Sequence, residues 1–276
     1  MVATKPKKGT PYRRVLQEQR QDQVFGGLYQ WTQVALAYHS NRIEGSELTE
    51  MQVRSLYDTG TARQPTRGVD IIEALNSFNA VDWVLDHVGE PVTADTLKTL
   101  HRFVKAGTPQ AFEPDFNLGE WKSVGNVVGG VATTSPELVD EQITALLKAT
   151  PKRMTIKDIA RFHYGFEAIH PFTDGNGRVG RLVAFKQCLD NDLVPFVLSH
   201  YQRGLYYLAL GAYKEEPRLL EALVQDAQNQ FLAQYGEYVP HDADLGEPRL
   251  SKAPYPSAAF LDVLMGAVRE HDRRPQ

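Results

Sequence analysis

The sequence has very little cysteine, with Cys188 as the one thiol in 276 residues. A single thiol cannot form an internal disulfide, and the histidines do not cluster around it at the spacing of a zinc site. We therefore interpret Cys188 as a small residue of the core or its boundary and not as a nucleophile. The basic residues near the N-terminus are not followed by an apolar segment, which argues against a secretory signal.

Long apolar runs and an excess of basic charge are also missing. No run approaches the roughly 20 residues that a helix needs to span a bilayer. The net charge is −4, which does not suggest a nucleic-acid-binding surface. Apolar residues make up 42% and charged residues 23% of the chain, as is usual for a globular protein with a sizeable core. Together these features predict a cytoplasmic protein without a membrane or nucleic-acid partner.

Apolar residues recur at spacings of three and four along most of the chain, which predicts amphipathic helices. We expect residues 1–20 to be a polar, partly disordered lead-in, and residues 258–269 to form a last helix within a loosely tethered, proline-rich extension. The remaining predicted helices cover approximately residues 21–39, 49–57, 69–87, 93–107, 136–147, 155–169, 178–189, 205–213 and 218–235.

Local signals at turns sharpen this prediction. Thr49 with Gln52 forms a capping box, Thr93 is an expected N-cap, and Thr155 with Asp158 is an imperfect capping box. Residues 121–134 are rich in valine and glycine and predict a short β-hairpin. A two-stranded hairpin is marginal alone and must lie on the helical body. The fold class is therefore mainly α, with one small hairpin.

The clearest chemistry begins at His170. A histidine titrates near neutral pH and can accept a proton from an attacking group. Pro171 disfavours helical geometry at the preceding residue, so a helix that reaches His170 should end there. Asp174 follows and supplies a carboxylate that can hold a divalent cation.

A glycine-rich turn comes next. Gly175, Asn176 and Gly177 carry little side chain and lead into an apolar helical pattern, and such a loop binds phosphate through its backbone amides. Arg178 and Arg181 are three residues apart and share one face of that helix. A base, a metal ligand, an anion-binding loop and two cations are the parts that phosphoryl or nucleotidyl transfer requires.

The segment from His170 to Arg181 reads HPFTDGNGRVGR and matches every fixed position of H-x-F-x-(D/E)-G-N-G-R-x-x-R, the signature of the Fic family. The chain therefore resembles Fic proteins, which are helical bundles with a β-hairpin flap, here residues 121–133. On this basis we divide it into an N-terminal helical region (1–90), a catalytic core (91–236) and a C-terminal extension (237–276).

The resemblance implies a protein adenylyltransferase, which transfers AMP from ATP to a hydroxyl side chain. His170 would be the general base and Asp174 would hold Mg²⁺. The loop 175–177, Arg178 and Arg181 would bind the phosphates. The target protein would dock on the flap by strand addition, and the chain itself is an alternative target. The sequence is compatible with an oligomer.

Two further sets of residues enter through the resemblance. Tyr206 and Tyr207 lie where the family often has a tyrosine near the adenine pocket, although aromatics at helical spacing also fit a core. Ser40, Glu44 and Gly45 fit the inhibitory pattern (S/T)-x-x-x-E-(G/N). By resemblance, Glu44 would pair with the second motif arginine and withdraw it from the γ-phosphate.

Other activities remain open at this stage. The same site could transfer UMP or another group, remove AMP with Glu44 orienting a water, or act like a kinase, as in the Doc branch. The chain could also be a non-enzymatic module that docks a peptide on the flap. The complete set of polar motif residues argues against this last interpretation, because a docking module has no use for a base such as His170.

Overall fold

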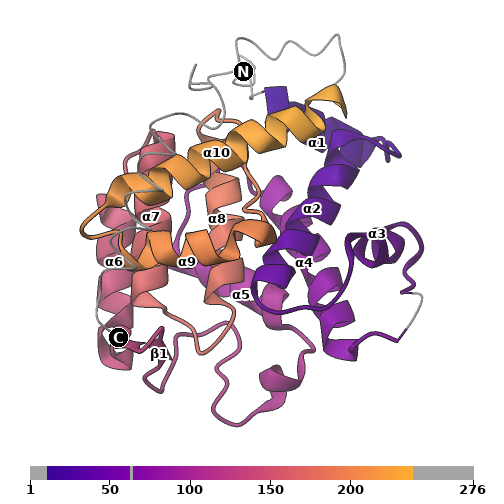
Figure 1. The fold of residues 1–276 in the computed structure, drawn as a ribbon. Coiled ribbons are helices and arrows are strands. Elements are labelled where there is room, and N and C mark those ends of the chain that lie inside the picture. The colour runs from indigo at the N-terminus through magenta and orange to yellow at the C-terminus, as the bar shows by residue number, and fades with distance from the viewer. Residues whose placement is uncertain (1–10, 63–64, 239–276) are drawn as a thin grey trace, which may run out of the picture.

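The computed structural model describes residues 11–62 and 65–238, so the helix predicted at residues 258–269 lies outside the described residues. The described part is mostly helical, with one two-stranded antiparallel sheet, which confirms the predicted fold class (Figure 1). No helix in these two ranges has the length and apolarity to cross a membrane. The α-helices are α1 (Pro11–Gln21), α2 (Leu28–Ile43), α3 (Glu50–Thr59), α4 (Gly68–Asp86), α5 (Ala94–Lys105), α6 (Val139–Ala149), α7 (Ile156–Ile169), α8 (Asn176–Asp190), α9 (Arg203–Gly211) and α10 (Pro217–Tyr235).

The helix that the rest surrounds is α8. Every residue from 178 to 189 is buried, so this helix is enclosed on all sides and its sequence shows no polar face. Helices α2, α4, α5 and α7 pack against it, and Figure 1 shows it in the middle of the molecule. Cys188 lies on this helix and is fully buried, which confirms its interpretation as a core residue. The enclosure of α8 also carries Arg178 and Arg181 into the interior.

The lead-in predicted for residues 1–20 is wrong for its second half, because residues 11–20 belong to α1. Tyr12, Val15 and Leu16 are buried on one face of this helix. Its many charged and polar residues occupy the other face and hide the short apolar stripe from a composition-based reading. The main core contains residues of α1, α2, α4 and α5 together with residues of α6 to α10. The N-terminal helices therefore pack directly on the helices that carry the motif.

Three predicted helix starts are present. Thr49 and Gln52, and likewise Thr155 and Asp158, form reciprocal capping boxes. Thr93 caps α5 and also completes such a box with the residue three positions on. Each box satisfies two backbone amides that have no partner within the helix.

The predicted hairpin is formed by β1 (Val127–Val128) and β2 (Val131–Ala132). Val127 pairs with Ala132, and Val128 with Val131. Gly129 and Gly130 between them have φ values of 57° and 80°, as a type I′ turn requires at both central positions. All four strand residues are exposed.

The 3₁₀ helices are η1 (Pro109–Phe112), η2 (Pro136–Leu138), η3 (His200–Gln202) and η4 (Gly236–Tyr238).

Candidate active site

The motif forms the turn between α7 and α8. His170 follows the last residue of α7 and adopts a left-handed conformation, with φ 52° and ψ 62°, so the helix ends where the following proline predicts. Both polar atoms of the Asn176 side chain bond the backbone of Phe172, at 2.9 and 2.8 Å. The Phe172 ring is fully buried and stacks on His101 with ring centroids 4.0 Å apart. The loop is therefore fixed by its own hydrogen bonds through Asn176 and by the packing of Phe172 in the core.

The imidazole of His170 lies partly buried beside a cation. Burial lowers the pKa of His170, and the nearby Lys122 ammonium lowers it further, while Glu44 and Asp174 act in the opposite direction. The net effect favours the neutral ring near pH 7, which is the form that accepts a proton.

The carboxylate of Asp174 is half exposed and faces two cations. Its Oδ2 accepts a hydrogen bond from Lys105 Nζ at 2.6 Å and lies 3.4 Å from Arg178 Nη2. Burial opposes its ionisation, but Arg178 and Lys105 outweigh burial and hold the pKa of Asp174 below its usual value. An ionised, accessible carboxylate is a ligand that Mg²⁺ prefers when phosphate oxygens supply the other positions. Asp174 therefore fits the metal role that the sequence predicts.

Arg178 turns toward α4. Its side chain is 6% exposed and forms an ion pair with Glu73 in the second turn of that helix. Lys105 Nζ lies 3.5 Å from the same carboxylate. Four charged side chains thus form one network beneath the loop. The sequence analysis missed Glu73 and Lys105, because each stands alone in a helical pattern and no local spacing links them to the motif.

Arg181 turns toward the end of α2. Its Nε donates to Ser40 Oγ at 2.9 Å, and its Nη2 donates to Ser40 O at 3.1 Å and to Glu44 Oε1 at 2.6 Å. Burial works against the charge of Arg181, but Glu44 more than offsets it and raises the pKa of the guanidinium. The structure therefore brings together the residues that the inhibitory pattern would pair.

The end of α2 determines where Glu44 lies. Gly45 N donates to Arg42 O at 3.2 Å and Ser46 N donates to Asn41 O at 2.9 Å, the two bonds of a Schellman motif. Gly45 has a φ of 97°, which the motif needs and which a side chain would strain. A carboxylate at the C-terminus of a helix is unfavourable by itself, because that end carries negative partial charge. The position of Glu44 is thus explained by Arg181 and not by helix stability.

A glycine on α8 leaves room for this contact. A Cβ atom at Gly177 would collide with Glu44 Oε1 and lie 2.9 Å from Arg181 Nη1. Any larger residue at position 177 would therefore push the carboxylate or the guanidinium aside. Gly177 serves the loop in two ways, since its small size also leaves its backbone accessible.

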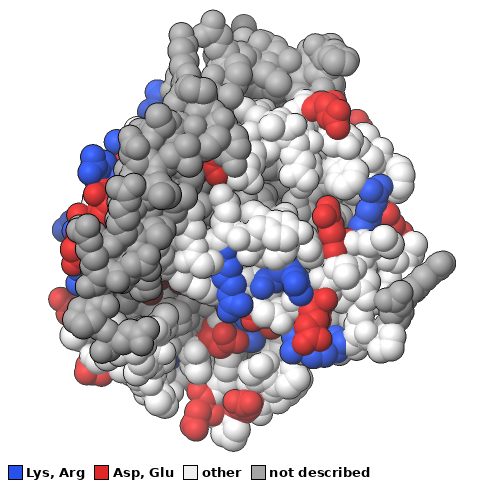
Figure 2. All heavy atoms as spheres, viewed as in Figure 1, with Lys and Arg blue, Asp and Glu red and all other residues white. Residues whose placement is uncertain are grey.

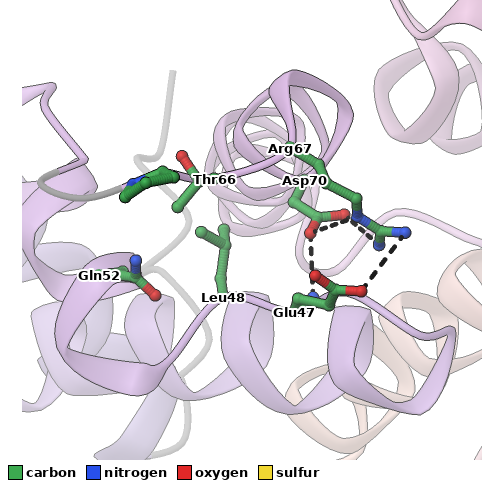
Figure 3. A pocket seen from close by; sticks show the side chains of 7 residues that line it. Glu47, Leu48, Gln52, Thr66, Arg67 and Asp70 are labelled. Atoms are coloured by element: carbon green, nitrogen blue, oxygen red, sulfur yellow. Dashed lines mark hydrogen bonds and ion pairs between the residues drawn. The ribbon is translucent and has the colours of Figure 1, made fainter.

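The chain beyond Gly45 is anchored by a second ion pair, shown in Figure 3. Asp70 is buried and accepts hydrogen bonds from Arg67 at 2.7 and 3.1 Å and from Glu47 N at 3.0 Å. Arg67 Nη2 also donates to Gly45 O at 3.0 Å. These residues border a pocket of about 320 Å³, which Leu48, Gln52, Pro65 and Thr66 complete. The segment after Glu44 is therefore fixed to the start of α4.

The two candidate tyrosines have different environments. Tyr206 is 2% exposed and its hydroxyl is bonded to His163 Nε2 at 2.8 Å, so it is a core residue without an open face for a base. Tyr207 is 43% exposed, and its hydroxyl is 3.5 Å from Ile43 O. The exposed Tyr207 is the better candidate for the adenine pocket. His163 is a packed, hydrogen-bonded histidine.

A buried acid lies behind these residues and was not anticipated. Burial raises the pKa of Glu167 to about 8, against the opposing charge of Arg181. Its Oε1 is buried without a hydrogen-bond partner among the described residues, and a Cβ on Gly180 would lie 2.5 Å from it. Glu167 is therefore largely protonated at neutral pH, one turn before His170.

On the face drawn in Figure 2, acidic and basic side chains of the described residues lie interspersed.

A helical fold with a glycine loop, a neutral base and two buried arginines is typical of a protein that binds nucleotide phosphates at a helix N-terminus. Residues 91–188 match the model of the Fic/DOC family. This match covers less than half of the chain, so it is a similarity of this segment to that family.

Curated relatives agree with this similarity. The chain is 30% identical over 178 residues to "Protein adenylyltransferase Fic" of Nematostella vectensis, which covers 62% of this chain and 40% of that protein. It is 28% identical over 184 residues to "Protein adenylyltransferase fic-1" of Caenorhabditis elegans, covering 63% and 35%. The chain thus spans well under half of the length of these relatives.

Solved structures share the fold. A Fic-1 fragment from C. elegans superposes with a TM-score of 0.65 at 23% identity, over 84% of this chain and 66% of that one. A Fic-domain signalling protein from Bacteroides thetaiotaomicron gives a TM-score of 0.61 at 21% identity, over 84% and 85%.

Proposed function

We propose that the chain is a protein adenylyltransferase that transfers AMP from ATP to a hydroxyl side chain of a target protein. The observation that carries the proposal is the position of a neutral imidazole, His170, at the entrance to a glycine loop backed by Arg178 and Arg181. The names of the curated relatives support the same reaction.

In this reaction the target hydroxyl attacks the α-phosphorus of ATP and its proton passes to His170. A new bond forms between the hydroxyl oxygen and the α-phosphorus, and the bond to the bridging oxygen of pyrophosphate breaks. Arg178 and Arg181 neutralise the departing phosphates, with the amides of the loop 175–177. Mg²⁺ held by Asp174 would supply further neutralisation of the α- and β-phosphates.

The contact between Glu44 and Arg181 supports a regulatory role for the end of α2. A guanidinium that is bonded to Ser40 and Glu44 is not available to a γ-phosphate. Displacing Glu44 would free the Nη2 hydrogen bond that it accepts, beside Nη1, which has no hydrogen-bond partner among the described residues. We therefore include autoinhibition by Glu44 in the proposal.

The flap supports a docking role. Its strands are short and exposed, and an exposed strand edge offers unpaired amides and carbonyls to an extended peptide. A target segment would be held there with its hydroxyl toward His170, in the cytoplasm. The chain can also supply the hydroxyl itself. This self-modification can be measured with the purified protein alone.

The test uses purified wild-type protein and the Glu44→Gly and His170→Ala variants, each incubated with ATP and Mg²⁺. Intact mass is then measured. We expect Glu44→Gly to gain AMP faster than the wild type, and His170→Ala in the Glu44→Gly background to lose about 10²- to 10⁴-fold in rate, as expected for a missing general base.

Normal transfer by the His170→Ala variant would remove the base assignment. An unchanged rate in Glu44→Gly would remove the inhibitory role of α2. If no variant gains AMP, the same series with GTP, UTP and CTP shows whether the donor is another nucleotide.

A further inference from the structure

Lys122 is a buried lysine at the start of the flap segment, ahead of β1. It is 2% exposed. Its Nζ donates to Asn126 Oδ1 at 2.8 Å and to Thr133 Oγ1 at 2.6 Å, and lies 3.4 Å from Ile169 O. Asn126 immediately precedes β1 and Thr133 immediately follows β2. One ammonium group therefore joins the two ends of the hairpin to the last residue of α7.

The backbone of the same segment continues this attachment. Lys122 N donates to Pro171 O at 2.8 Å, and Asn126 Nδ2 donates to Phe172 O at 3.1 Å. The carbonyl groups on both sides of His170 are thus bonded to Lys122, and the next carbonyl is bonded to the residue that opens the flap. The base of the flap and the backbone around the imidazole form one connected unit.

The charge of Lys122 is unusual for its position. Among the described residues its ammonium contacts neutral oxygen acceptors and no carboxylate, and burial lowers the pKa of Lys122 to about 8. A buried ammonium without an ionic partner is costly. Three neutral acceptors with suitable geometry compensate for part of that cost.

We propose that Lys122 is a positioning residue for the transfer reaction: it fixes the flap to the backbone on both sides of His170. The inference rests on the proposed function, because it assigns a role in that reaction. The flap determines where the hydroxyl of a docked segment lies, and His170 determines where its proton goes. A displacement of about 1 Å between such groups is enough to lower a rate by roughly two orders of magnitude.

Lys122 also lies close to the base, since its Nζ contacts the carbonyl of the residue that precedes His170. The charged groups that act on His170 are Lys122, which favours the neutral ring, and Glu44 and Asp174, which favour the protonated ring. Removing the Lys122 charge should therefore raise the pKa of His170. Because the reaction needs the neutral base, the rate would then rise at a higher pH than before.

The experiment compares Lys122→Met and Lys122→Arg in the Glu44→Gly background, with Lys148→Met as the matched control. Lys148 is an exposed lysine of α6, so its substitution removes the same charge without touching the flap attachment. The readouts are the rate of self-modification between pH 5.5 and 8, and amide hydrogen exchange of residues 124–134 relative to α8.

We expect Lys122→Met to lower the rate at least about tenfold and to move the midpoint of the pH profile upward by roughly half a unit or more. Exchange should accelerate in the flap but not in α8. Lys122→Arg should recover part of the rate with the midpoint unshifted, because it keeps a charge and donors. Lys148→Met should leave all three readouts unchanged.

Unchanged flap exchange in Lys122→Met would overturn the attachment. An unchanged rate and midpoint, with faster exchange, would overturn the role in the reaction. Accelerated exchange in α8 would indicate that Lys122→Met unfolds generally. The Lys122→Arg variant then decides the question, because a shifted midpoint of its pH profile would overturn the proposal. If the Glu44→Gly parent transfers no nucleotide, the proposed function fails, whereas the exchange comparison still decides whether Lys122 attaches the flap.

Discussion

The two arginines of α8 are one turn apart and equally buried, with 6% and 5% of their side chains exposed, yet they belong to different kinds of contact. Arg178 pairs with Glu73 in the second turn of α4, and Arg181 pairs with Glu44, the C-cap residue of α2. Glu73 is 12% exposed and Glu44 is 28% exposed. The backbone of Glu73 is fixed within α4, whereas Glu44 is the residue at which α2 ends.

The networks differ in the same way. Glu73 serves Arg178 and also lies near Lys105, which in turn bonds Asp174. Loss of one member would leave several buried charges unbalanced. Glu44 forms its one ion pair in the described residues with Arg181. Arg178 is therefore held by a network of several charges, whereas Arg181 is held by one ion pair at the end of a helix.

The largest effect should come from comparing Glu73→Gln with Glu44→Gln. Glu73→Gln leaves two buried cations with one carboxylate and should lower the free energy of unfolding by about 3 kcal/mol, since breaking a buried pair is strongly destabilising. Glu44→Gln should cost less than about 1 kcal/mol, because its side chain is at the surface end of α2 and keeps a hydrogen-bonding oxygen. Urea unfolding at pH 7 measures both values. Equal losses would break the distinction between the two arginines.

A pH-dependent effect is expected from Glu167, whose pKa is influenced by Arg181 and Glu44. Its folded-state pKa of about 8 is above the ordinary value of 4.5. The stabilising contribution of the protonated form is therefore complete below pH 4.5 and is lost as the pH rises to about 8. Glu167→Gln cannot titrate, so its stability relative to the wild type should increase across this window.

Thermal or urea unfolding at pH 5 and pH 8.5 checks this prediction, because the difference between the two proteins removes the contribution of other groups. A constant difference across the two pH values would show that Glu167 is ionised in the folded state.

The smallest effect should come from Ser40→Ala in the otherwise unchanged protein. The substitution removes the Oγ acceptor of Arg181 Nε but leaves Ser40 O and Glu44 in place. The loss of one hydrogen bond should raise self-modification only about two- to fivefold, below the effect of Glu44→Gly. The rates of the three proteins under identical conditions decide the order. Equal activation by both variants would mean that Ser40, and not the carboxylate alone, determines the contact.

Much of the architecture follows from local patterns. The helices, three of their starts and the hairpin with its Gly129–Gly130 turn depend on periodicity, capping and glycine, which act over a few residues. The motif segment could be located for the same reason, since His170 and Arg181 are the first and last of twelve consecutive residues. The contact of Glu44 with Arg181 came from a family resemblance and not from the spacing itself.

The residues that were missed act across long sequence separations. Glu73 and Lys105 lie far from Arg178 along the chain, and single charges in helical patterns carry no sign of their partners. Lys122 was hidden within a hairpin pattern, where a lysine is ordinarily exposed. Its burial depends on the packing of the hairpin against the motif loop. The buried face of α1 was overlooked because three apolar residues in a polar helix are a weak periodic signal.

The Schellman end of α2 has a consequence for how this chain can vary in length. Ser40 and Glu44 meet the same guanidinium because they are four residues apart, slightly more than one turn. One residue inserted between them would rotate the carboxylate by about 100° around the helix axis and point it away from α8. The length of the last turn of α2 therefore determines whether Glu44 reaches Arg181. This turn tolerates many changes of side chain, but an insertion or deletion between positions 40 and 45 would separate the carboxylate from the guanidinium.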